Sequence, residues 1–434
     1  MMFSKFRRFI ICCSAFSYPL VSAATDYLAD DWAVQSVVSE APIIIQQDKG
    51  LVDVTTVIAK GDLAYASDDQ ISLARASLGL VSEGSPDTGS YLKADLELNY
   101  YHPKDDALNG DESAEYVLKI NDLWVQFSND DCSTKLGRQG IFWGSVEGTG
   151  ALDMVSPLDF SEPLLTDYSQ IKRAQDSFNF TCFSNSLDAE IFLIPSPLVN
   201  LVSPKQPADF ERLEAVLKPE WGARVAHHRE GFDFSVHLGR FFENSPDFIL
   251  NPVSFEPEGL YVSQFMLYGF GTVLAVDRLL LEMDVSYRKE QRHAGELIEE
   301  NSEFLGNKPL KERVDVSLGF EYTTSNNHSF SGGAWFYPYR DSVGIEDERD
   351  TLLLNANWSR QYLNDDLTLS VLALWQKYPE SYQFTLLSEY LINDYWSVDM
   401  ALSYQHIKEP FLGAALNMAA PEKTALLFTM AYQF

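Results

Sequence analysis

Apolar and polar residues alternate one by one in many separate stretches of this 434-residue chain. Residues 90–101 show the pattern, because Leu92, Ala94 and Leu96 are separated by Lys93 and Asp95. A period of two places successive side chains on opposite faces of a β-strand, so each stretch predicts a strand with one apolar and one polar face. Other clear stretches are 187–194, 232–239, 277–288, 312–322, 395–405 and 424–434. Less regular ones are 52–65, a run from Ile71, 116–127, 132–138, 176–183, 221–229, 260–271, 328–337, 350–359, 366–376 and 382–391.

A single stretch of this kind also fits a half-buried strand of a soluble sandwich, so the connectors between the stretches matter. Short connectors, such as Thr324–Asn327 and Glu230–Gly231, alternate with long or acidic ones, such as 139–175, 195–220 and 289–311. Alternation of short turns with long loops is typical of outer-membrane barrels. The stretches therefore predict an all-β fold over residues 51–434, a single transmembrane antiparallel β-barrel of about 18 strands. Sixteen strands is the fallback if a weak stretch is not a strand.

The last eleven residues alternate most cleanly. Leu426, Phe428, Met430, Tyr432 and Phe434 share one face. This aromatic-ended segment resembles the closing strand of bacterial outer-membrane β-barrels. The resemblance implies that the barrel-assembly machinery recognises the strand ending at Phe434, and that outer-membrane lipids and lipopolysaccharide surround the wall.

The N-terminal residues have the organisation of a secretory signal peptide. Lys5, Arg7 and Arg8 precede a short apolar segment, Phe9 to Leu20, and the small residues Val21-Ser22-Ala23 follow. This segment is too short for a membrane span and ends in a cleavage pattern. We expect residues 1–23 to be removed, residues 24–50 to form an N-terminal periplasmic segment, and the mature chain to reside in the outer membrane of a Gram-negative bacterium.

The composition excludes several classes of protein. The formal net charge is −31, and removal of the three basic residues of the signal peptide changes it to −34. Such an acidic chain does not bind nucleic acid nonspecifically. No stretch of 18 apolar residues occurs, so no transmembrane helix is predicted.

Two cysteines remain after removal of the signal peptide. Cys132 begins one predicted strand and Cys182 ends the next, and alternation places both side chains on the same face. An oxidising compartment favours a cross-strand disulfide between them, and two free thiols are the alternative.

The connector after residue 138 is unusual. Five glycines within residues 137–150, with Pro157 and Pro163, exclude a regular helix or strand across it. A connector as long as this one, which covers residues 139–175, usually carries function. Leu136-Gly137-Arg138-Gln139, Trp143-Gly144, Pro157-Leu158-Asp159 and Arg173-Ala174 together resemble an uncharacterised porin-like family of outer-membrane proteins. The resemblance covers mainly residues 116–195 and implies an envelope barrel without indicating a substrate.

This long connector has two possible places. It could fold into the lumen and narrow it, with opposed charges setting solute preference, or it could lie on the extracellular rim with its charges solvated. The candidate constriction residues are Arg138, Asp153, Asp159, Glu162, Asp167, Lys172 and Arg173.

Alternation also predicts the lumen wall, in which acidic residues outnumber basic ones and favour cations or neutral solutes. The candidate wall residues are Lys93, Asp95, Glu97, Asp188, Glu190, Asp233, Glu282, Asp284, Arg288, Asp315 and Glu321.

The sequence predicts no catalytic residues, cofactor or metal site. None of the seven histidines belongs to a nucleophile motif, and G-x-S-x-G does not occur. His227 and His228 point to opposite faces of one strand, and no Cys/His spacing resembles a zinc site. We therefore expect a channel for passive diffusion of cationic or neutral small solutes rather than an enzyme. The alternatives are an exopolysaccharide export barrel, and a closed structural or assembly barrel that binds partners through its loops.

Overall fold

The structure is a computed structural model that describes residues 52–66, 71–102, 115–146, 150–159, 171–201, 208–250, 257–292, 310–337, 351–377, 380–407 and 422–434. The predicted signal peptide and the predicted N-terminal segment 24–50 lie outside the described residues. Within the part of the chain that is described, no helix is long and apolar enough to cross a membrane.

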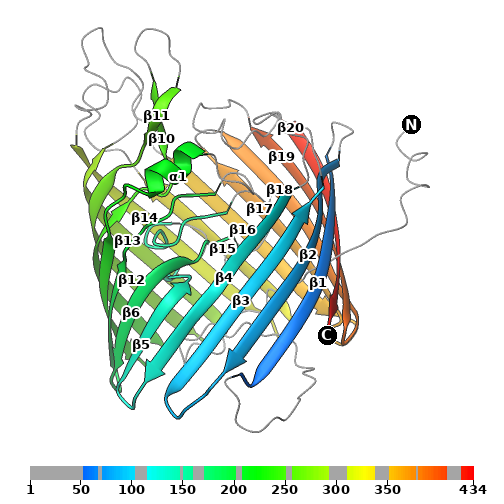
Figure 1. Cartoon of the computed structure of the whole chain (residues 1–434), viewed down its shortest axis with the longest axis horizontal. Helices are drawn as coiled ribbons and strands as arrows, with labels where there is room; N and C mark the ends of the chain where they lie inside the picture. The colour runs from blue at the N-terminus through cyan, green and yellow to red at the C-terminus, as the bar shows by residue number, and fades with distance from the viewer. Residues whose placement is uncertain are drawn as a thin grey trace.

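The main element is one 18-stranded antiparallel sheet that closes on itself (Figure 1). Neighbouring strands in the sequence pair with each other around the ring, except where the hairpin β10–β11 is inserted between β9 and β12. The strands of the first half are β1 Val54–Ala66, β2 Ile71–Gly84, β3 Ser90–Tyr101, β4 Glu115–Ser128, β5 Cys132–Gln139, β6 Gln175–Phe183, β7 Leu187–Ile194, β8 Glu220–Arg229 and β9 Phe232–Phe242. Those of the second half are β12 Gln264–Val276, β13 Leu279–Arg292, β14 Leu310–Thr323, β15 His328–Tyr337, β16 Thr351–Tyr362, β17 Leu367–Gln376, β18 Ser381–Asn393, β19 Trp396–Ile407 and β20 Glu422–Gln433.

All 18 predicted strands are present, so the fold class and the strand number are confirmed and the fallback of 16 is not needed. Two elements of the long connectors were not predicted. These are the helix α1 (Ala208–Glu214) and the hairpin of β10 (Asp247–Leu250) with β11 (Pro257–Tyr261). Both lie at the end of the barrel that carries the long connectors, at the upper left in Figure 1. We call this end the long-connector end and the opposite end the short-turn end.

The ring closes between the first and last strands. β1 pairs with β20, and the backbones of Val57 and Phe434 exchange two hydrogen bonds of 3.0 and 2.9 Å. The terminal strand therefore closes the barrel, as its resemblance to the closing strands of outer-membrane barrels implies. No free sheet edge remains in this seam, and an open edge cannot exist in a hydrocarbon environment.

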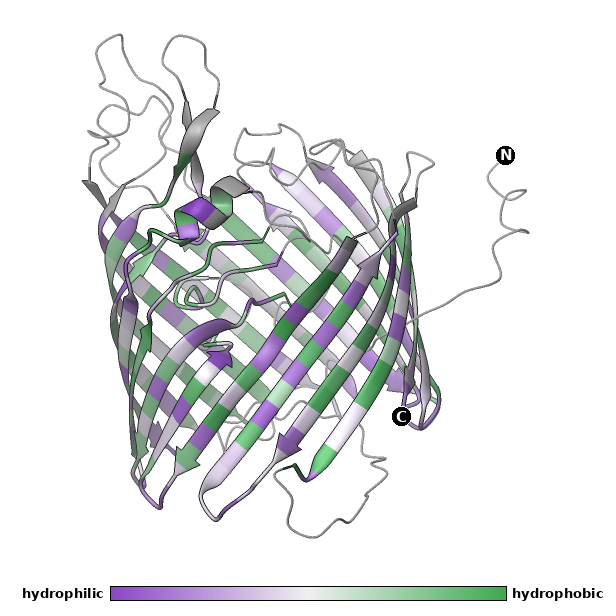
Figure 2. Cartoon of the chain, in the orientation of Figure 1, coloured by the Kyte–Doolittle hydropathy of each residue, from purple (hydrophilic) through white to green (hydrophobic). Residues whose placement is uncertain are grey.

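The two faces of the wall differ as alternation predicts. Side chains such as Leu318 and Phe384 are about half exposed on the outer face, 51% and 53%, while Asp315 and Ser317 on the inner face are fully buried. The alternation is visible as bands of opposite hydropathy along each strand in Figure 2. The exposed apolar outer face and polar inner face reverse the usual arrangement of a soluble protein, which is the pattern of a barrel surrounded by lipid.

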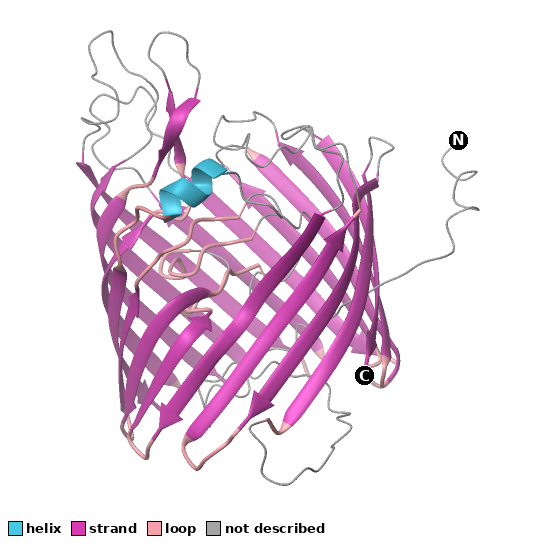
Figure 3. Ribbon diagram, viewed as in Figure 1, coloured by secondary structure: helices cyan, strands magenta, loops and turns pink. Residues whose placement is uncertain are grey.

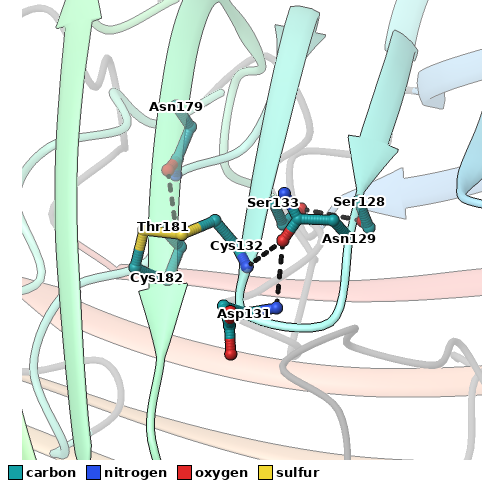
Figure 4. The surroundings of a disulfide bond; sticks show 8 residues. All are labelled: Ser128, Asn129, Asp131, Cys132, Ser133, Asn179, Thr181 and Cys182. Carbon is teal, nitrogen blue, oxygen red and sulfur yellow. Dashed lines mark hydrogen bonds between the residues drawn. A yellow bond between two sulfur atoms is a disulfide. The ribbon is translucent and has the colours of Figure 1, made fainter.

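Cys132 and Cys182 form a disulfide at the short-turn end of β5 and β6 (Figure 4). The two residues are direct partners in the strand ladder, with a Cα–Cα distance of 4.0 Å. The adjacent turn is held by Asn129, whose side-chain oxygen accepts hydrogen bonds from the backbone N–H groups of Asp131 and Cys132. The predicted cross-strand pairing is present, and the strand register rather than a compact core brings the cysteines together.

Candidate functional site: a segment folded into the lumen

The eleven predicted wall residues lie on the inner face. The register places Asp95 and Glu97 opposite Val81 and Gly79, and Asp284 opposite Gly271 and Ser317, in rows that face the lumen. The inner face also carries charges that the sequence analysis did not single out, because they lie in or next to the less regular stretches. These are Lys60, Asp62, Arg75, Glu83, Lys119, Asp122, Lys135, Glu220 and Glu389.

Most basic groups of this inner face are paired with carboxylates. Lys60 donates to Glu97 at 2.9 Å, and Arg75 donates to Asp62 at 2.6 Å. Lys93 lies 3.4 Å from Glu83 and 3.5 Å from Asp122. Because the acids outnumber the bases, these pairs leave negative charge in excess on the described inner face.

Strands β5 to β7 have only 8, 9 and 8 residues, compared with 14 in β4. The wall is therefore low here, and β5 and β6 end below their neighbours in Figure 1. At this point the chain leaves the wall and turns inward. Figure 3 shows the described parts of the long connector as pink loops within the ring of strands, below α1. We call residues 141–146, 150–159 and 171–174 the inner segment.

An apolar cluster fixes the inner segment to the wall. Trp143, which is 1% exposed, packs edge-on against Phe192 of β7 and Phe241 of β9, with ring centroids 5.0 and 5.5 Å apart. Leu152, Met154 and Val155 join the same cluster. The wall contributes Phe192, Ile194, Phe241, Phe265 and Leu267, all from inward positions of β7, β9 and β12. The inner segment thus lies in the lumen, and the rim alternative is excluded for these residues.

A wall carboxylate holds the backbone of the inner segment. One oxygen of Asp284 on β13 accepts hydrogen bonds from the backbone N–H groups of Ser145 and Val146, at 2.8 and 2.9 Å. Arg288, four residues further along β13 and on the same face, donates to the carbonyl of Gly150 at 3.0 Å. Hydrogen bonds to charged groups are stronger than neutral ones, so this strand positions the segment as well as lining the lumen.

The candidate constriction residues do not gather at one point of the lumen. Asp153 and Lys172 come together as a buried ion pair within the inner segment. Burial raises the pKa of the Asp153 carboxyl, and the neighbouring Lys172 ammonium opposes this effect. Asp159 pairs instead with Lys119 of β4 at 2.7 Å. Glu162 and Asp167 lie outside the described residues.

Arg173 does not face the other candidates. Its guanidinium donates to Glu214 of α1 at 3.2 Å and to the carbonyl of Val199. Glu214 also accepts a hydrogen bond from the backbone of Val199 at 2.9 Å. Arg173 therefore ties the inner segment to α1. The sequence offered no sign of this role because α1 was not predicted.

The prediction that Arg138 lines the constriction is wrong, because its side chain lies on the outer face. It forms two hydrogen bonds with Asp176 of β6, at 3.0 and 2.9 Å, and shares the outer face with Leu136 and Phe178. Strict alternation along β5 carries Arg138 outward, so it does not line the lumen.

His237 of β9 faces the lumen and packs within the wall. His237 is 2% exposed, its Nε2 lies 2.8 Å from the Ser235 hydroxyl, and its ring packs against Trp143 at 4.8 Å. Among the described residues, no group of three or more His, Cys, Asp or Glu side chains is arranged to hold a metal ion.

Comparison with solved structures places this architecture among outer-membrane barrels. Pseudomonas aeruginosa OpdK, solved with vanillate, aligns over 88% of this chain and 98% of its own, with 8% identity and a TM-score of 0.54. A second structure of this outer membrane protein gives 0.52 with the same identity and coverage. Pseudomonas aeruginosa OccK11 aligns over 88% and 95%, with 9% identity and a TM-score of 0.50. The chain has the fold of these barrels. Neither a protein-family model nor a curated protein sequence matches it.

Proposed function

We propose that this chain is a porin-like channel of the Gram-negative outer membrane through which cationic or neutral small solutes diffuse passively. The observation that carries the proposal is the inner segment, which occupies the lumen and is attached to a polar, acid-rich inner wall. A segment held there reduces the cross-section of the bore, and fixed charges around a narrowed bore set solute preference. The proposal includes no covalent chemistry, no cofactor and no metal.

The N-terminal and C-terminal segments fit this location. The predicted signal peptide would deliver the chain to the periplasm. The closing strand, which ends in Phe434, would be the segment that the assembly machinery recognises. The likeness of residues 116–195 to a porin-like family supports the same assignment, and the long connectors would then face the cell exterior.

Conductance in planar bilayers tests the proposal. We expect steady ohmic steps and, in a salt gradient, a reversal potential that shows cation preference, because the carboxylates of the wall outnumber its basic groups. A silent barrel would support the closed structural or assembly barrel. Conductance only in the presence of an acidic polymer would support the export barrel.

A wall variant sharpens the selectivity test. Glu321→Gln removes a lumenal carboxylate of β14, so it should lower the ratio of cation to anion permeability without abolishing conductance. Asp130→Asn, at an exposed turn of the short-turn end, is the matched control and should leave the ratio unchanged. Anion selectivity of the wild-type pore would contradict the proposed preference.

A further inference from the structure

A hollow with a volume of about 740 Å³ lies on the outer face of the barrel, across strands β13 to β18. Its floor is made by small side chains at outward positions of three adjacent strands: Gly332, Ala334, Ala356 and Ala373. We call this hollow the outer trough. Its volume lies within the range of ordinary ligand pockets.

The strand register shows why the outer trough exists. Phe320, Gly332, Ala356, Ala373 and Phe384 are successive partners in a single row across five strands. Two aromatic rings thus end a row whose three middle members are small. Four strand spacings of about 4.8 Å separate the two rings, or about 19 Å.

The neighbouring outward rows are bulky and form the sides of the outer trough. On the side of the short-turn end, the row contains Phe330, Trp358 and Val371. On the other side, Leu318, Leu354, Trp375 and Tyr382 accompany the single small residue Ala334. The small residues therefore form the floor of a depression between two rows of bulky apolar side chains.

The two ends of the outer trough differ. Near the short-turn end, the Phe320 ring lies over Gly332, where a Cβ atom would be only 2.8 Å from it. That end is therefore closed. The other end, at Phe384, lies nearer the long-connector end beside Trp375 and Tyr382, and the exposed Lys377 directly follows β17. Alternation from Trp375 places Lys377 on the outer face.

We propose that the outer trough binds one acyl chain of a phosphate-bearing lipid of the outer leaflet, which in this membrane is lipopolysaccharide. The inference rests on the outer-membrane location proposed above. A narrow apolar depression fits a single hydrocarbon chain. Two convex barrel walls, in contrast, would touch along their ridges and leave the depression empty. Lys377 then places the lipid phosphate at the long-connector end, where a cation attracts anionic headgroups.

Native mass spectrometry of the detergent-purified barrel tests this proposal, with lipid A and phosphatidylethanolamine as separate probes. We expect wild-type protein to retain one lipid A molecule in preference to phosphatidylethanolamine. Ala356→Phe fills the outer trough and should weaken lipid A retention at least about tenfold. Lys377→Ala should weaken lipid A alone. Ala76→Phe, an exposed outward alanine of β2, is the matched control and should retain lipid A.

Equal retention of lipid A by Ala356→Phe and wild type would overturn the proposal, as would a preference for phosphatidylethanolamine or a stable dimer lost in Ala356→Phe. Conductance separates this proposal from the proposed function, because the outer trough lies on the opposite face from the lumen. Ala356→Phe should conduct like wild type, which also shows that it folds. A conducting wild-type barrel that retains no lipid A would overturn the lipid site alone.

Discussion

The inward side chains on two sides of the lumen differ in chemical character. On β7, β9 and β12, inward positions carry large apolar side chains such as Phe192, Phe241 and Leu267, and the inner segment packs on them. On β18 and β19, inward positions carry groups such as Gln383, Thr385 and Ser403, which hydrogen-bond to one another at 3.1 to 3.4 Å. We call these the packed wall and the polar wall. Apolar residues on both faces of a barrel strand therefore mark the place where a connector folds inward.

The largest expected effect comes from removing the central ring of the packed wall. Trp143→Ala should destabilise docking of the inner segment by about 3–5 kcal/mol, the usual loss for a buried aromatic side chain. Hydrogen exchange of peptides covering residues 141–146 should then become fast, and single-channel conductance should rise. Trp396→Ala, on the outer face of β19, should change neither quantity. Unchanged exchange in Trp143→Ala would mean that the cluster does not hold the segment.

A smaller effect is expected at the carboxylate that holds the backbone. Asp284→Asn keeps an acceptor but loses the charge, so docking should weaken by part of the about 1.5–3 kcal/mol typical of a hydrogen bond to a charged group. The same exchange measurement should show intermediate protection of Ser145 and Val146. Asp399→Asn, a lumenal acid of the polar wall, should leave that protection intact. An equal loss of protection in both variants would show that the packed wall and the polar wall do not differ in holding the inner segment.

A pair of glycines gives the finest comparison. At Gly222, on the packed side, an added Cβ atom would lie 2.5 Å from the Trp143 ring, whereas at Gly79 of β2 the nearest atom would be 3.6 Å away. Gly222→Ala should therefore overpack the contact and cost about 1–3 kcal/mol of docking free energy. Gly79→Ala should be tolerated. Thermal unfolding and hydrogen exchange of the two variants test this expectation. If Gly222→Ala behaved like Gly79→Ala in both measurements, the inner segment would not approach β8 closely.

Most of the wall could be predicted from the sequence, since a period of two is a local property and a closed barrel repeats it. The strand number follows from it, and so does the placement of Cys132 and Cys182 on one face, although the sequence left free thiols as an alternative to the disulfide. The seam at Phe434 was implied by the resemblance of the last strand to closing strands. The contacts of the inner segment could not be predicted, because they join residues such as Ser145 and Asp284 that are far apart in the chain. One signal was present: residues 191–194 and 265–268 are apolar on both faces, and these are the strands that the inner segment covers.

Arg138 illustrates the limit of reasoning from a motif. Its place at the start of a long connector suggested the constriction, but one step of alternation carries it to the outer face beside Asp176. Charge type indicates what a side chain can bind, whereas strand parity decides which side of the wall it reaches.

A cross-link between the inner segment and the wall tests most directly whether the segment lies inside the lumen. A Cβ atom added at Gly271 of β12 would lie 3.4 Å from the Ser145 hydroxyl, close enough for two sulfur atoms to join after modest movement. The double variant Ser145→Cys with Gly271→Cys should therefore form a disulfide between these positions, identified by mass spectrometry of the unreduced peptides. Two thiols that remain free and react with a membrane-impermeant reagent from the cell exterior would instead place the segment on the rim.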